Sequence, residues 1–172
     1  RLLMGQIQPL FPPPDTMAFM EWLLLGISLA LILSCGVFGA AEYSLVAVDR
    51  TAVEKAAAAG DRRARGVLAA LRTLSSQLSG AQIGVTLTNL AIGFLAEPAL
   101  STLLTPPLKA FGIPSGLVPI LSVGLAVAVA TVLTMILGEL VPKKLGIAIP
   151  MQVAMATQSF MRGFTWLMTY PI

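Results

Sequence analysis

The stretch WLLLGISLALILSCGVFGAA, residues 22–41, decides the fold of this chain because it carries no charged side chain from its first residue to its last. At a rise of about 1.5 Å per residue, a helix of this length crosses a hydrocarbon core about 30 Å thick. A secretory signal peptide is the alternative, but this run is long for one and leads into Glu42 and Tyr43 instead of a small-residue cleavage site. We therefore expect the first membrane span here.

Two further stretches have the same character. Residues 73–96 are uncharged and end at Glu97, which predicts a second span. Residues 110–138 are also uncharged, and their regular part after Pro114 predicts a third span, which we expect Pro142 to close. Four prolines between the second and third spans indicate an irregular connection with at most one short helix; they are Pro98, Pro106, Pro107 and Pro114.

The composition agrees with a membrane protein. The chain has 172 residues, of which 56% are hydrophobic and 11% charged, and its mean hydropathy is +0.87. A soluble domain this apolar would have too little polar surface to cover it. We expect one all-α integral membrane domain over residues 17–172, preceded by a proline-rich stretch, residues 1–16, that is typical of a flexible leader or an expression remnant.

Residues 49–72 form a basic segment between the first two spans. The six basic residues alternate with alanine and leucine; they are Arg50, Lys55, Arg62, Arg63, Arg65 and Arg72. Gly60 and Asp61 separate two short helical stretches, which we expect to lie as amphipathic juxtamembrane helices on the cytoplasmic membrane surface. Nucleic-acid binding is the other use of such a run, but the position between two spans argues against it.

The last stretch, residues 145–170, is apolar but contains Pro150 and Arg162. We interpret it as an interfacial helix that wraps around the bundle as a belt. A fourth span remains the alternative, because the uncharged piece before Arg162 is only marginally short for one.

Any metal site in this chain must be built from oxygen atoms. Histidine is absent and Cys35 is the only cysteine, so neither a disulfide within the chain nor a Cys/His cluster can form. Oxygen sites suit Mg²⁺, Ca²⁺ or alkali ions. The missing histidine also removes the commonest general base, and we therefore expect no enzyme.

The strongest candidate ligand is Glu139, near the inner end of the third span. Pro142 has no N–H for the carbonyl of Gly138, which we expect to be free beside that carboxylate. Ionisable groups at membrane depth usually face a partner or a water-filled path. The alternative for Glu139, and for Glu42 at the end of the first span, is an interfacial ion pair with a nearby basic residue.

Three polar residues in the first and second spans could complete an oxygen set. Asn89 is the most polar residue of the second span, and Ser34 and Ser44 lie in and just after the first. Taken singly, an asparagine more often bonds to a neighbouring helix and a serine to its own helix. Together with Glu139 they offer the hard oxygens that a cation such as Mg²⁺ prefers.

Three stretches resemble the signature motifs of the CorC/CNNM magnesium transporters: FGAAE (38–42) leading to VDR (48–50), GVTLTNLAIG (84–93) and GELVPK (138–143). The resemblance implies a homodimer in the cell membrane, plasma or inner, that exports dehydrated Mg²⁺ with Na⁺ as the coupled ion. It also implies metal ligands at Ser34, Ser44, Asn89, Gly138 and Glu139. Members of that family continue into cytoplasmic CBS and C-terminal domains, which this sequence lacks. A dimeric membrane anchor that does not transport is the competing interpretation.

Charge placement predicts the orientation. Basic residues cluster after the first span and, as Lys143 and Lys144, after the predicted third span, while Lys109 stands alone between the second and third spans. By the positive-inside rule the N-terminus lies outside and the C-terminus in the cytoplasm.

The orientation can be tested with single cysteines in a Cys35→Ala background. In intact cells, a membrane-impermeant thiol reagent is expected to label Ser115→Cys and to leave Ala58→Cys unlabelled until the cells are opened. The reverse pattern would invert the topology.

Overall fold

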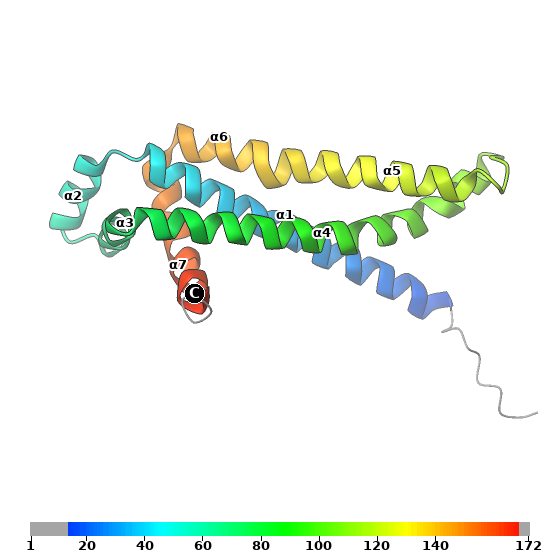
Figure 1. Cartoon of the computed structure of the whole chain (residues 1–172), viewed down its shortest axis with the longest axis horizontal. Helices are drawn as coiled ribbons and strands as arrows, with labels where there is room; N and C mark the ends of the chain where they lie inside the picture. Colours follow the sequence, from blue (N-terminus) through cyan, green and yellow to red (C-terminus); the bar gives the residue numbers. More distant parts are fainter. Residues whose placement is uncertain (1–13, 169–172) are drawn as a thin grey trace, which may run out of the picture.

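The computed structural model describes residues 14–168, and this part of the chain consists of helices joined by short turns (Figure 1). The elements in chain order are α1 (Pro14–Ala47), α2 (Arg50–Ala58), α3 (Arg62–Arg72), α4 (Leu74–Ala110), α5 (Val118–Leu133), the π-helical segment η1 (Thr134–Leu140), α6 (Val141–Ala148) and α7 (Pro150–Met168). The expected leader, residues 1–16, lies mostly outside the described residues, and its last three residues belong to the first turn of α1.

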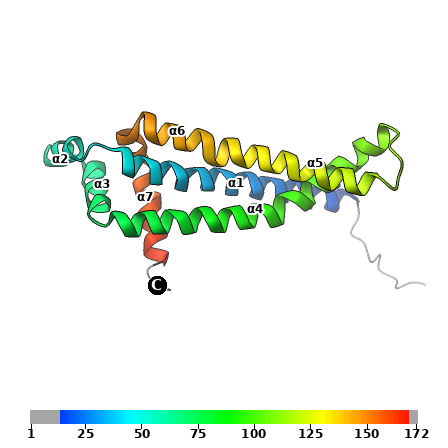
Figure 2. The ribbon, with the colours of Figure 1, turned by 45° about the horizontal axis from the view of Figure 1, so that its top comes forward.

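The predicted all-α membrane fold with three spans is confirmed. Three helical stretches are long and apolar enough to cross a membrane, namely Phe19–Ala47, Leu74–Ala110 and Val118–Ala148. They run side by side in both views (Figures 1 and 2). The third span is made of α5, η1 and α6 joined end to end.

The expected irregular connection between the second and third spans is wrong for most of its length. Instead α4 continues through Pro98, Pro106 and Pro107 to Ala110. A proline removes one hydrogen bond and commonly kinks a helix without ending it, and the last part of α4 bends toward α5 in Figure 2. There the Ser101 hydroxyl donates a hydrogen bond to the Ser122 hydroxyl at 3.4 Å, which ties α4 to α5.

The third span also does not stop at Pro142, contrary to the sequence prediction. Ahead of the proline the backbone widens into η1, where the Val141 N–H bonds to the Ile136 carbonyl, five residues earlier. A π-helical turn of this kind shifts the hydrogen-bond register and lets the helix continue past a residue that has no N–H. The helix then runs on as α6 to Ala148.

A close approach of α1 to the third span occurs at Gly36. A Cβ atom on Gly36 would lie 2.9 Å from Cγ of Pro142 and 3.0 Å from the Leu137 carbonyl oxygen. Only a glycine leaves room for the proline ring at this distance. The proline and the π turn are therefore held against the middle of the first span.

α7 crosses the long helices instead of running along them (Figures 1 and 2). It is not among the stretches apolar enough to span a membrane, so the described residues contain no fourth span. The ring of Phe38 on α1 stacks against Phe160 and Phe164 of α7, with centroids 5.1 and 4.6 Å apart. This arrangement agrees with the predicted belt, although α7 begins at Pro150 because residues 145–148 belong to α6.

The two short helices form where the basic segment predicted them. The Asp49 carboxylate accepts a hydrogen bond from the Thr51 N–H at 2.9 Å, and the Asp61 carboxylate accepts one from the Arg63 N–H at 2.7 Å. Each aspartate thus caps the N-terminus of its helix. The buried side chains of Val53 and Val67 pack these helices into a small apolar cluster with the end of α1 and with α7.

Packing between α4 and α1 depends on Gly84. A Cβ atom there would lie 2.6 Å from the ring of Phe38, which is buried.

Gly84→Ala is therefore expected to lower the free energy of unfolding by about 1–3 kcal/mol through overpacking. Thermal unfolding in detergent measures this effect. Gly93→Ala on the same helix is the matched control, because no atom lies within 4 Å of its Cβ position. An equal change in both variants would contradict the packing.

Candidate functional site

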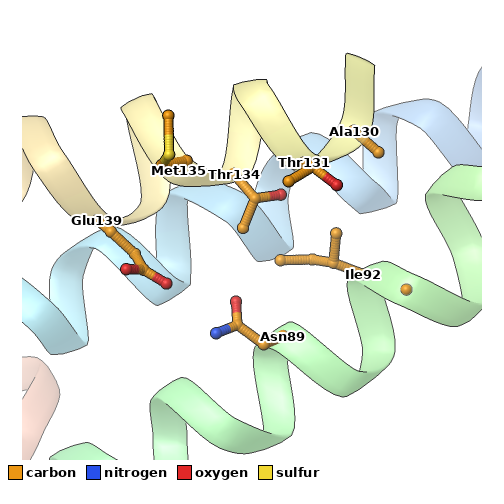
Figure 3. Close-up of a pocket in the computed structure, with 8 residues that line it drawn as sticks. Asn89, Ile92, Ala130, Thr131, Thr134, Met135 and Glu139 are labelled. Carbon is orange, nitrogen blue, oxygen red and sulfur yellow. The ribbon is translucent and has the colours of Figure 1, made fainter. Parts of the chain in front are cut away.

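A pocket of about 380 Å³ lies between α4 and the third span (Figure 3). It is lined by Asn89, Ile92, Gly93, Ala130, Thr131, Thr134, Met135 and Glu139. The Asn89 amide and the Glu139 carboxylate extend into the space between the two helices, and Thr134 lies on the same side of the third span (Figure 3). Two predicted ligands thus share one pocket with two hydroxyl groups.

Helical periodicity places these side chains on facing surfaces. On α4, Asn89 and Gly93 are four residues apart and so share one face. On the third span, Thr131 and Thr134 share a face because they are three residues apart. Glu139 follows Thr134 by five residues, which corresponds to one turn of the π-helical hydrogen-bond pattern. The π turn therefore helps to bring the carboxylate to the pocket.

The Glu139 carboxylate is paired with a cation. Its Oε2 atom lies 3.5 Å from Nζ of Lys143, and the two side chains are 39% and 36% exposed. The same ammonium group lies 5.4 Å from the ring centroid of Tyr43 on α1, within the range of a cation–π contact. A partly exposed ion pair one turn apart on a helix is weak, so the carboxylate remains available to another cation.

The Asn89 amide is held by a residue that sequence reasoning missed. The Cys35 thiol donates a hydrogen bond to Oδ1 of Asn89 at 3.4 Å. Cys35 is fully buried, and its sulfur lies 3.7 Å from the position of a Cβ on Gly138. From sequence, Cys35 served only to exclude disulfides and Cys/His sites. The available signal was Gly36 and Gly39, one and four residues further along the first span, because small residues mark the face where helices approach closely.

The two predicted serine ligands do not line the pocket. The Ser34 hydroxyl donates to the Ala30 carbonyl at 2.8 Å, and the Ser44 hydroxyl donates to the Ala41 carbonyl at 3.0 Å. The serines are ten residues apart on α1, which is about 15 Å along the helix axis. Ligands of one Mg²⁺ lie about 2.1 Å from the ion, so both serines cannot contact the same ion in this conformation.

Gly138 is buried on the α1 side of the third span. Its carbonyl oxygen lies 3.8 Å from the position of a Cβ on Gly39 of α1, so it faces the first span. Its assignment as a metal ligand, like that of the four side chains, stays a prediction. Glu42 does not line the pocket either.

The threonines of the third span are the other residues that sequence reasoning missed. Thr131 and Thr134 are spaced three apart in an otherwise apolar stretch, and that spacing was the available signal. No three His, Cys, Asp or Glu side chains come together in the described part of the chain. A cation held in this pocket would therefore have Glu139 as its one carboxylate, with amide, hydroxyl or water oxygens as the remaining ligands.

Comparison with known proteins identifies the family. The sequence model of the Cyclin M transmembrane N-terminal domain, abbreviated CNNM, matches residues 26–172. The chain belongs to the CNNM transmembrane-domain family. The match extends over all three spans and α7, so the resemblance seen in the three sequence motifs is confirmed.

Bacterial proteins are similar to this CNNM domain over most of its length. A UPF0053 protein from Mycobacterium tuberculosis is 43% identical over 141 residues, which cover 82% of this chain and 31% of that protein. The UPF0053 protein YhdT from Bacillus subtilis is 31% identical over 149 residues, which cover 87% of this chain and 32% of that protein. The chain thus spans about a third of the length of the curated relatives it matches.

Single cysteines can determine whether the pocket of this CNNM domain holds water or lipid. Thr131 and Val132 are neighbours on the third span and both are exposed, but only Thr131 lines the pocket. In a Cys35→Ala background, Thr131→Cys is expected to react with a small charged thiosulfonate, since thiolates form in water. Val132→Cys is expected to stay unreactive against lipid. Equal reactivity at the two positions in the bilayer would contradict a hydrated pocket.

Proposed function

We propose that this chain is the membrane domain of a transporter that binds Mg²⁺ between its spans and exports it with Na⁺ entry as the coupled flux. The observation that carries the proposal is the shared pocket of Asn89, Thr131, Thr134 and Glu139 between two membrane-spanning helices. Oxygen donors of these kinds suit a hard divalent cation. An acidic residue at membrane depth that faces a cavity is typical of an ion pathway.

The size of the pocket favours entry of a hydrated ion. Its volume of about 380 Å³ is roughly ten times the 30 Å³ that a water molecule occupies in the liquid. Mg²⁺ gives up its water reluctantly and keeps several water ligands at most protein sites. Binding of a dehydrated ion then requires α4 and η1 to approach each other, so that protein oxygens replace the waters.

Lys143 acts in this proposal as a resident cation. Its ammonium group neutralises Glu139 while no metal is bound, and Mg²⁺ competes with it for the same carboxylate. The Tyr43 ring offers the displaced ammonium a second contact on α1. Exchange of Lys143 for Mg²⁺ would keep the Glu139 carboxylate paired in both states, and an unpaired carboxylate in the membrane is costly.

The proposal extends to a homodimer in the cell membrane with a cytoplasmic C-terminus. Only 11% of the most apolar part of the third span is buried within one chain, which leaves apolar surface for lipid or a second copy. Cytoplasmic regulatory domains of a longer protein would lie on the membrane side that carries α2 and α3. The Gly138 carbonyl and one of the two serines, Ser34 or Ser44, remain candidate ligands in a conformation with closer helices.

A non-transporting dimeric membrane anchor is the second candidate. It is favoured by the fact that both pocket ligands already have partners within the chain, Asn89 with Cys35 and Glu139 with Lys143. In an anchor these contacts would only hold the helices together, and no cation would bind.

Calorimetry with Mg²⁺ on the detergent-solubilised chain separates the two candidates. Glu139→Ala is expected to abolish Mg²⁺ binding, and Asn89→Ala is expected to weaken it about tenfold, the loss expected for one charge-assisted contact. Glu97→Ala is the matched control, since Glu97 is a partly buried acid on α4 that does not line the pocket. Unchanged affinity in Glu139→Ala, or an equal loss in Glu97→Ala, would contradict the proposed site.

A further inference from the structure

Three arginines from two distant segments surround one opening. Arg62 and Arg65 come from α3 and Arg162 comes from α7, and together with Gly66 they line a cavity of about 380 Å³. No acidic residue lines it. The opening is separate from the pocket between α4 and the third span, with which it shares no residue.

The charges of these arginines are not neutralised by the described part of the chain. The ion pairs found there are Arg50 with Glu54 and Lys143 with Glu139. Arg65 donates to the Gly60 carbonyl at 3.4 Å, which uses one of its donors. Each guanidinium has five N–H donors, so most donors around the opening are left for water or a ligand.

Helix packing fixes the arrangement. Gly66 is buried where α3 meets α7, and a Cβ on it would lie 3.2 Å from Nη1 of Arg162 and 3.3 Å from Cγ of Gln158. The missing side chain thus lets the Arg162 guanidinium rest directly on α3. Arg62 and Arg65, three residues apart, share the face of α3 beside it. The three positive charges converge because of this close contact.

A buried amide lies beside the same glycine. Gln158 is 4% exposed, and its Nε2 atom has no hydrogen-bond partner among the described residues. A buried donor without a partner is costly and needs an explanation. Gln158 is one turn before Arg162 on α7 but does not line the opening, so its amide belongs to the packed contact between α3 and α7 behind the arginines.

We propose that this opening binds a phosphate group, with Arg62, Arg65 and Arg162 as its ligands. Guanidinium groups match phosphate oxygens in geometry and form strong charge-assisted hydrogen bonds with them. A phosphate here would bridge α3 and α7, and so would fasten the belt helix to the juxtamembrane helix. The site does not depend on the proposed transport of Mg²⁺.

The phosphate of an anionic lipid headgroup is the source that the surroundings favour. Trp166 stands one turn after Arg162 on the same face of α7 and is 76% exposed. Aromatic side chains of this kind concentrate at the membrane–water interface. A lipid could place its phosphate among the arginines and its acyl chains beside this ring. A free phosphate from solution would use only the arginines.

Native mass spectrometry of the detergent-solubilised chain tests the site with phosphatidylglycerol and, for comparison, phosphatidylcholine with the same acyl chains. Phosphatidylglycerol is expected to bind in preference, and Arg65→Gln and Arg162→Gln are each expected to reduce its binding about tenfold. Arg63→Gln is the matched control, because Arg63 is an exposed arginine of α3 that does not line the opening. It should bind the lipid as the unchanged chain does.

A second measurement distinguishes the two sources of phosphate. Thermal unfolding is followed with inorganic phosphate and with chloride at equal ionic strength. One outcome would assign the site to a soluble phosphate. In it, inorganic phosphate stabilises the chain, Arg162→Gln abolishes that stabilisation, and the chain shows no preference for phosphatidylglycerol. An equal loss of lipid binding in Arg63→Gln would overturn the proposal in favour of unspecific charge attraction. No preference for phosphatidylglycerol together with no stabilisation by phosphate would also overturn it.

Discussion

The close contact between Gly36 of α1 and Pro142 of the third span is the constraint on which the rest of the membrane part depends. The proline lacks an N–H, so the helix ahead of it adopts the π-helical segment η1. The proline ring fills the space that Gly36 leaves open. A larger residue at Gly36 would push the two helices apart. Without Pro142 the third span could keep the ordinary α-helical hydrogen bonds in place of the π-helical segment.

The candidate ion site follows from that constraint. The π turn sets the side from which Glu139 leaves the third span, and the same turn places Gly138 next to Cys35. Cys35 in turn donates to the Asn89 amide on α4. A chain of short contacts thus connects all three spans around one small region. Because Asn89 lies on α4 and Glu139 on η1, movement of either helix would change the distance between the two side chains.

The peripheral helices couple to the spans through α7. Phe38 of α1 packs against Phe160 and Phe164 of α7, while Arg162, between them in sequence and on the opposite helix face, rests on Gly66 of α3. α7 therefore contacts both the first span and the basic segment. α7 packs on α1 as well as on α3. A ligand that changed the contact between α3 and α7 would therefore also change the packing of α7 on the first span.

The sequence by itself determined the fold class, the positions of the three spans and the two short helices between the first two. Uncharged length decides whether a segment crosses a bilayer, and an aspartate followed by good helix formers decides where a short helix begins; both are local properties. The three motifs also identified the family. They selected Asn89 and Glu139, which the structure brings to one pocket.

Only the tertiary structure decided what the prolines do and which polar groups meet. Pro98 and Pro142 were read as helix ends because a proline removes a hydrogen bond, but neighbouring helices supply packing that offsets this loss, so both helices continue. Thr131, Thr134 and Cys35 are isolated polar residues in apolar stretches, and their sequence positions did not predict that they lie at the site. The arginine opening joins residues about a hundred positions apart. Which of these side chains meet depends on the angles and distances at which the helices pack. Close contacts at Gly36, Gly66 and Gly84 fix that packing, and the local sequence does not show which helix each glycine contacts.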